Sequence, residues 1–168
     1  MNLQDIHNDE VVFVDANILI YAGQGQSRQC RQLLQRIDGK AVRGVCTTVV
    51  VAELCHRSML NEARAKHLIS GPNPAKALSQ RREIVGQLSE YAEIVRDILN
   101  SELAVEPVQP GDLMVALELQ RQHGLLTNDS LHLAVAKRLG IRGIATADTG
   151  FDNVPGVIIY KPEDIITS

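Results

Sequence analysis

Apolar residues along this chain fall into two patterns: short continuous runs, and stripes that recur every three or four positions. The short runs predict strands at 11–15, 44–46, 104–108, 143–147 and 157–160. The stripes predict helices at 27–37, 47–68, 110–123 and 129–139. Because strands and helices alternate, the pattern favours an α/β fold with a parallel sheet and crossover helices.

The clearest break in this pattern is the stretch SGPNP at 70–74, where glycine and proline interrupt regular structure. Apolar residues after the break share a helical period and predict one long helix over 75–100. The helices on both sides predict a hairpin excursion at about 60–100, within an extended helical region between about 55 and 100. We expect this excursion to protrude from a single domain that comprises residues 1–168. Pro107 predicts an edge position for its strand, because proline cannot donate a backbone hydrogen bond.

The length of 168 residues is sufficient to bury a core without disulfides or structural metal. Cys30, Cys46 and Cys55 are odd in number and form no C-x-x-C pair, which favours free thiols in a reducing cytosol. No apolar run approaches the roughly 20 residues of a membrane span, and the polar N-terminus is unlike a signal peptide. These features predict a cytoplasmic protein with no membrane association.

The formal net charge of −3 provides no overall basic footprint for nucleic acid. Basic residues nevertheless cluster locally along the sequence. The clusters are Arg28, Arg31, Arg36, Lys40 and Arg43, then Arg57, Arg64 and Lys66, then Lys76, Arg81 and Arg82. A basic rim around an acidic centre would be compatible with a phosphodiester substrate.

Four acidic residues occupy positions at which such a fold collects its ligands. Asp15 and Asp148 each follow an apolar strand, and the carboxyl ends of parallel strands meet at one edge of the sheet. Glu53 lies within an apolar helix, and Asp129 opens another. Crowded carboxylates repel one another unless a cation neutralises them, so the set predicts a hard divalent metal ion.

Three of these positions also have a simpler structural explanation. Asp15 is a residue type that favours turns, and Asp129 suits a helix N-terminus because of the helix dipole. Glu53 can form an ion pair with Arg57 one turn later on an exposed helix face. His132, one turn after Asp129, is expected to be a packed or surface histidine rather than a ligand.

Four short motifs follow one another along the chain. They are VVFVDANILIY at 11–21, VVVAEL at 49–54, ND before SLHLAVA at 128–136, and TADTGFD at 146–152. Together they resemble the PIN domain, and their order and the chain length are similar to those of bacterial and archaeal VapC-type toxins. The resemblance covers roughly residues 11–160 and implies a three-layer α/β/α sandwich with a central parallel sheet.

The resemblance also implies the roles of particular residues. The four acidic positions that catalyse and bind metal in this family are matched by Asp15, Glu53, Asp129 and Asp148. Asn17 and Thr146 match the polar positions that orient those carboxylates. Independently of the resemblance, Asp152 lies close to Asp148 in the sequence and is an alternative or supporting carboxylate. The helical region between Glu53 and Asp129 departs from the short toxin pattern because it is longer.

The implied activity is that of a metal-dependent endoribonuclease, which uses Mg²⁺ or Mn²⁺ to hydrolyse RNA phosphodiester bonds. Family members frequently form homodimers and are often inhibited by a small antitoxin protein, so both partners are expected here. The alternative is a catalytically silent PIN-like module that binds RNA or protein without turnover.

Two other enzyme classes fit the sequence less well. Aspartyl phosphotransferases of the haloacid dehalogenase type also place an Asp after the first strand, but they need a second Asp two residues later. This chain has Asn17 there. A P-loop enzyme would require the pattern G-x-x-x-x-G-K-[ST], which the sequence lacks.

Overall fold

The computed structural model describes residues 1–166 and contains a five-stranded, fully parallel sheet with the order β3-β2-β1-β4-β5. The strands are β1 (Val11–Val14), β2 (Arg43–Thr47), β3 (Ala104–Glu106), β4 (Gly143–Ala145) and β5 (Ile158–Tyr160). All five predicted strands are present, and β3 lies at an edge as Pro107 predicts. Three of them, β1, β3 and β4, end one or two residues before their predicted ends, just before Asp15, Pro107 and Thr146.

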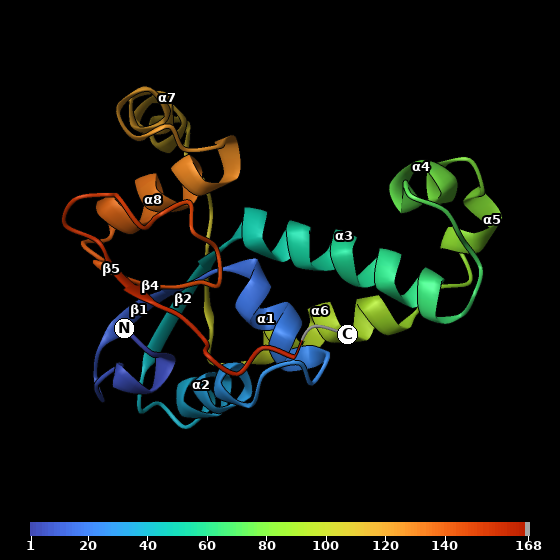
Figure 1. Cartoon of the computed structure of the whole chain (residues 1–168), viewed down its shortest axis with the longest axis horizontal. Helices are drawn as coiled ribbons and strands as arrows, with labels where there is room; N and C mark the ends of the chain where they lie inside the picture. The colour runs from blue at the N-terminus through green and yellow to red at the C-terminus, as the bar shows by residue number, and fades with distance from the viewer. Residues whose placement is uncertain (167–168) are drawn as a thin grey trace.

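Helices cover both faces of this sheet, which confirms the α/β/α sandwich. They are η1 (Leu3–Asp5), α1 (Ala16–Gly23), α2 (Arg28–Asp38), α3 (Thr48–Ala65), α4 (Pro74–Ser79), α5 (Arg82–Val85), α6 (Glu90–Asn100), α7 (Pro110–His123) and α8 (Thr127–Arg138). Figure 1 shows α7 and α8 on one side of the strands and α1 and α2 on the other. The helix α3 starts directly at the end of β2 and runs away from the sheet.

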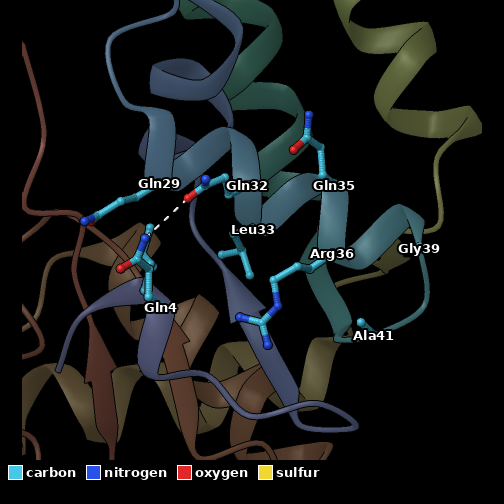
Figure 2. A pocket seen from close by; sticks show the side chains of 9 residues that line it. Gln4, Gln29, Gln32, Leu33, Gln35, Arg36, Gly39 and Ala41 are labelled. Atoms are coloured by element: carbon cyan, nitrogen blue, oxygen red, sulfur yellow. Dashed lines mark hydrogen bonds between the residues drawn. The ribbon is translucent and has the colours of Figure 1, made fainter.

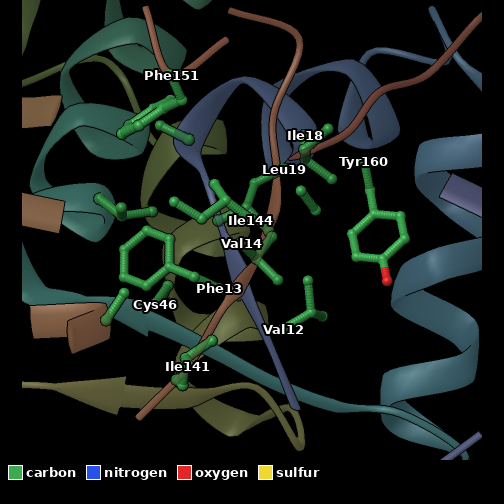
Figure 3. Packing of buried hydrophobic residues seen from close by; sticks show 14 of the residues in the cluster. Val12, Phe13, Val14, Ile18, Leu19, Cys46, Ile141, Ile144, Phe151 and Tyr160 are labelled. Atoms are coloured by element: carbon green, nitrogen blue, oxygen red, sulfur yellow. The ribbon is translucent and has the colours of Figure 1, made fainter. Parts of the chain in front are cut away.

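The main core surrounds the central strand β1 (Figure 3). Val12, Phe13 and Val14 are each fully buried, so this strand is apolar on both faces rather than alternating. Phe13 pairs in register with Val45 of β2 and with Ile144 of β4. Burial on both faces holds the carboxyl end of β1 in place, and that end carries Asp15.

A second, smaller apolar cluster stabilises a helical arm formed by α4, α5, α6 and the far end of α3. It consists of Ala63, Ile69, Leu78, Ile84 and Leu88. Figure 1 shows α4 and α5 at the tip of this arm, far from the sheet. The protruding helical region predicted between about 55 and 100 is therefore present.

The prediction of one continuous helix over 75–100 is wrong, because the segment forms three helices. Glu62 of α3 explains the last interruption. Its buried carboxylate accepts hydrogen bonds from the backbone N–H groups of Ser89 and Tyr91, at 2.9 and 3.0 Å, and from Lys66 Nζ at 2.6 Å. Unpaired N–H groups at a helix start need acceptors. Glu62, which lies 27 positions before Ser89, supplies such an acceptor. A separate helix, α6, therefore begins at Glu90.

Two helix starts concern acidic residues of the predicted site. The helix α1 extends over Ala16–Gly23 with Asp15 as its N-cap. The helix α8 begins at Thr127, so Asp129 is its third residue and not its first. Across residues 1–166, every helix is too short or too polar to cross a membrane.

Candidate active site

Asp15 lies at the carboxyl end of the central strand and is the most firmly held acidic residue of the site. The residue is 7% exposed. One carboxylate oxygen accepts a hydrogen bond from the Ala16 N–H at 2.7 Å, and the other accepts from Asn17 Nδ2 at 2.7 Å and Thr146 Oγ1 at 2.6 Å. Burial raises the pKa of Asp15, which the hydrogen bond from Thr146 partly counteracts and the nearby charge of Asp148 reinforces.

Asn17 and Thr146 join the ends of two neighbouring strands, β1 and β4. The Asn17 amide donates to Thr146 Oγ1 at 3.1 Å, and its carbonyl oxygen accepts from the Ala147 N–H at 3.0 Å. Thr146 Oγ1 in turn accepts from the Asp148 N–H at 3.0 Å. The structure thus places both residues where they orient Asp15 and the backbone that carries Asp148.

Asp129 is electrostatically the most perturbed member of the set. Its pKa is raised to about 6, first by burial and then by the negative charges of Asp148, Asp15 and Glu53. A shift with these causes means that Asp129 lies close enough to each of the other three carboxylates to be repelled by it. Among the described residues, no hydrogen-bond donor to Asp129 is present.

Gly150 leaves the space between two of these carboxylates open. A Cβ atom at this position would lie 3.2 Å from Asp129 Oδ2 and 3.7 Å from Asp148 Oδ1. Asp148 Oδ1 also accepts a hydrogen bond from the Gly150 N–H at 3.0 Å. The sequence reasoning did not single out Gly150, and only its place in the TADTGFD motif could have indicated it.

Glu53 approaches the site from α3 but is engaged by two other side chains. Arg57 Nη1 lies 3.6 Å from Glu53 Oε1, and Asn128 Nδ2 lies 3.4 Å from Glu53 Oε2. The ion pair with Arg57 is the simple i,i+4 contact considered from the sequence. This ion pair does not separate Glu53 from the other carboxylates, because the charge of Glu53 still contributes to the raised pKa of Asp129.

The donor chemistry of this site suits a hard divalent cation, since carboxylate oxygens are the ligands that such ions prefer. The mutual repulsion that raises the pKa of Asp129 is what a bound cation would relieve. Among residues 1–166, no three His, Cys, Asp or Glu side chains lie at the spacing needed to hold one metal ion together. Metal binding therefore requires the carboxylates to draw closer, and Glu53 would have to exchange its contacts with Arg57 and Asn128 for the ion.

Two further residues considered from the sequence have other surroundings in the fold. Asp152 is paired with Lys161, with a shortest distance of 2.6 Å between the carboxylate and Nζ. His132 is buried in the core, with its ring centroid 5.4 Å from that of Phe13. Neither ring nitrogen of His132 has a hydrogen-bond partner among the described residues, and burial lowers its pKa to about 4.

A cavity of about 570 Å³ lies elsewhere, between η1 and α2 (Figure 2). Its polar lining includes Gln4, Gln29, Gln32, Gln35 and Arg36. Gln4 and Gln32 are hydrogen-bonded to each other, and Arg36 donates to the backbone oxygen of Ile6 at 2.6 Å. None of the four carboxylates lines this cavity, so it is separate from the acidic site.

The fold is thus a parallel α/β/α sandwich in which the charges of Asp15, Glu53 and Asp148 act on Asp129 near the carboxyl edge of the sheet. A model of the PIN domain family matches residues 12–157, and the chain belongs to that family. Ribonuclease VapC13 of Mycobacterium tuberculosis is 25% identical over 151 residues, which cover 88% of this chain and 97% of that protein.

Solved structures share the fold at lower identity. VapBC2 from Rickettsia felis, bound to a DNA fragment from its promoter, has a TM-score of 0.59 at 17% identity, covering 91% of this chain and 99% of that one. VapC20 of Mycobacterium tuberculosis, a sarcin-ricin loop cleaving toxin, has a TM-score of 0.56 at 17% identity, covering 86% and 95%. These similarities support the expected fold class.

Proposed function

We propose that this protein is a metal-dependent endoribonuclease that hydrolyses RNA phosphodiester bonds and acts as the toxin of a toxin–antitoxin pair. The observation that carries the proposal is the convergence of three carboxylates on Asp129 at the positions of the family pattern: after burial, the charges of Asp148, Asp15 and Glu53 raise its pKa to about 6. The names of its curated relatives, which are VapC ribonucleases, support the substrate class.

The proposed ligands of Mg²⁺ or Mn²⁺ are Asp15, Glu53, Asp129 and Asp148. A bound ion of this kind would neutralise these carboxylates and the negative charge that develops on the phosphate during hydrolysis. Asp15 provides a rigid reference point, because three hydrogen-bond donors fix both of its oxygens. Asn17 and Thr146 maintain its orientation relative to Asp148.

Asp129 has a pKa raised to about 6, first by burial and then by the charges of Asp148, Asp15 and Glu53. A cation bound among these carboxylates would lower that pKa again, so Asp129 is proposed as one of its ligands. Its carboxylate has no donor among the described residues, so its oxygens are available to a water molecule. Asp152 has at most a supporting role, because Lys161 already binds it.

Two protein partners belong to the same proposal, a small antitoxin and a second copy of this chain. The Rickettsia felis structure is a VapBC complex, and a further neighbour, with a TM-score of 0.51, is a toxin–antitoxin complex from Klebsiella pneumoniae. Sedimentation of the purified chain at micromolar concentration tests the homodimer, which a purely monomeric species would contradict.

Cleavage of labelled single-stranded RNA with Mn²⁺ or Mg²⁺ tests the activity. We expect cleavage by the wild type, and loss of cleavage in EDTA and in Asp15→Asn. Asparagine is also a good N-cap, so this variant should keep α1 folded. Asp97→Asn, on the exposed face of α6, is the matched control and should retain activity.

Three outcomes separate the possibilities. Metal-dependent cleavage that requires Asp15 supports the nuclease. Binding of metal and RNA without cleavage of any RNA would instead indicate the catalytically silent module. A wild-type chain that binds neither Mn²⁺ nor Mg²⁺ would refute the proposed site.

A further inference from the structure

Arg57 is the cation that contacts the proposed metal site. It lies one turn after Glu53 on α3, with Nη1 at 3.6 Å from Glu53 Oε1. Among the ion pairs within residues 1–166, this is the only one that involves any of the four carboxylates. The positive charge of Arg57 therefore offsets part of the local negative charge.

The contact between Arg57 and Glu53 is loose and easily broken. The Arg57 side chain is 44% exposed and that of Glu53 is 30% exposed, so water screens the pair. The other oxygen of Glu53 is 3.4 Å from Asn128 Nδ2, which is near the limit of a hydrogen bond. Glu53 is thus held to one side by two weak contacts, and both are reversible.

A cation bound by Glu53 would compete with Arg57 for the same carboxylate. Once displaced, the guanidinium would remain beside the site, because its backbone is fixed on α3. A guanidinium is suited to a phosphodiester, since it can donate two parallel hydrogen bonds and keeps its charge. The RNA backbone is the phosphate that the proposed reaction brings to this place.

We propose that Arg57 alternates between two partners: it neutralises Glu53 when no metal is bound, and it binds the RNA phosphate backbone when metal takes Glu53. This inference rests on the proposed function. It assigns to Arg57 a substrate-binding role that differs from the role of the four carboxylates.

The inference predicts that one variant, Arg57→Gln, binds metal more tightly and RNA more weakly. Without the competing cation, Mn²⁺ should bind about two- to five-fold more tightly, which is the range that an exposed ion pair allows. RNA should bind less well, with a KM roughly ten-fold higher because a charge-assisted phosphate contact is lost. The dependence of RNA affinity on salt should also weaken by about the contribution of one phosphate.

Arg64→Gln is the matched control, because it removes the same charge from the same helix seven residues further on. That distance corresponds to about 10 Å along the helix axis, which is about one Debye length at moderate salt. Arg64 is exposed and, among the described residues, forms no ion pair. Its replacement should change neither Mn²⁺ affinity nor KM by more than about two-fold.

Calorimetric titration of the full-length chain with Mn²⁺ alone provides a readout that is independent of catalysis. Unchanged or weaker Mn²⁺ binding in Arg57→Gln, with normal binding in the wild type, overturns the inference and leaves the metal site intact. Tighter Mn²⁺ binding with an unchanged KM for RNA overturns the phosphate contact. A wild-type chain that binds no Mn²⁺ refutes the proposed function and this inference together.

Discussion

Replacement of Glu62 by glutamine is expected to destabilise the protein more than any comparable surface change. Glu62 is 5% exposed, and its carboxylate accepts hydrogen bonds from Lys66 and from the backbone N–H groups of Ser89 and Tyr91. Burial alone would raise its pKa, but these hydrogen bonds prevail and lower the pKa from 4.5 to about 2.

The size of this effect follows from the linkage between protonation and folding. A pKa that falls from 4.5 to about 2 on folding is equivalent to roughly 3 kcal/mol of stability. Glutamine retains one carbonyl oxygen, which can satisfy only part of the same set of donors. We therefore expect Glu62→Gln to lower the free energy of unfolding by about 2 kcal/mol at pH 7.

The pH dependence provides a second check. Because the pKa of Glu62 is lower in the folded state, its contribution is complete above pH 4.5 and is lost as the pH falls toward 2. Urea unfolding followed by circular dichroism should thus show the wild type and Glu62→Gln converging in acid. Glu118→Gln, on the exposed face of α7, is the control and should change stability by less than about 0.5 kcal/mol.

A loss below about 0.5 kcal/mol in Glu62→Gln would refute this reasoning, because it would mean that the carboxylate does not hold the start of α6. A constant difference between the two proteins from pH 7 to pH 2 would refute the electrostatic part alone. Cleavage activity measured in parallel would show whether the arm influences the site.

Two further predictions concern buried polar groups and close packing. Burial lowers the pKa of His132 from 6.5 to about 4, so the wild type should lose roughly 2 kcal/mol of stability between pH 7 and 5. His132→Phe should remove this loss, because phenylalanine does not titrate. Urea unfolding at both pH values checks this, and an equal loss in the variant would contradict it. Gly150→Ala should weaken Mn²⁺ binding at an unchanged urea midpoint, because the new Cβ would lie 3.2 Å from Asp129 Oδ2 and 3.7 Å from Asp148 Oδ1. If calorimetry instead gives Gly150→Ala the same Mn²⁺ affinity as the wild type, the two carboxylates need no open space between them.

The sequence was sufficient to locate the elements that depend on local patterns. The apolar run at Val11–Val14 and the turn-forming residues after it predicted a buried strand that ends at Asp15. Pro107 predicted the edge position of β3. Both follow from properties of a few neighbouring residues, namely apolar continuity and the missing N–H of proline, so no distant contact was needed.

The candidate site was partly accessible from the sequence for the same reason. Asp15 and Asp148 follow strands that pair in parallel, and Thr146 lies between β4 and Asp148, so their convergence is a consequence of strand direction. Electrostatic coupling among all four carboxylates required the tertiary structure. The helices that carry Glu53 and Asp129 approach the sheet edge at angles and distances that no local pattern records.

The tertiary structure alone decided three further features, each of which depends on residues far apart in the sequence. Residues 75–100 have a continuous helical period, yet the helix is interrupted because Glu62 binds the N–H groups at the start of α6. Asp152 lies in the same motif as Asp148, yet its carboxylate forms an ion pair with Lys161, which directly follows β5. His132 has no local partner to indicate its state, and its burial against Phe13 lowers its pKa. Local patterns determine where strands and helices form, whereas the partner of a charged or polar side chain depends on which distant residues the fold brings near it.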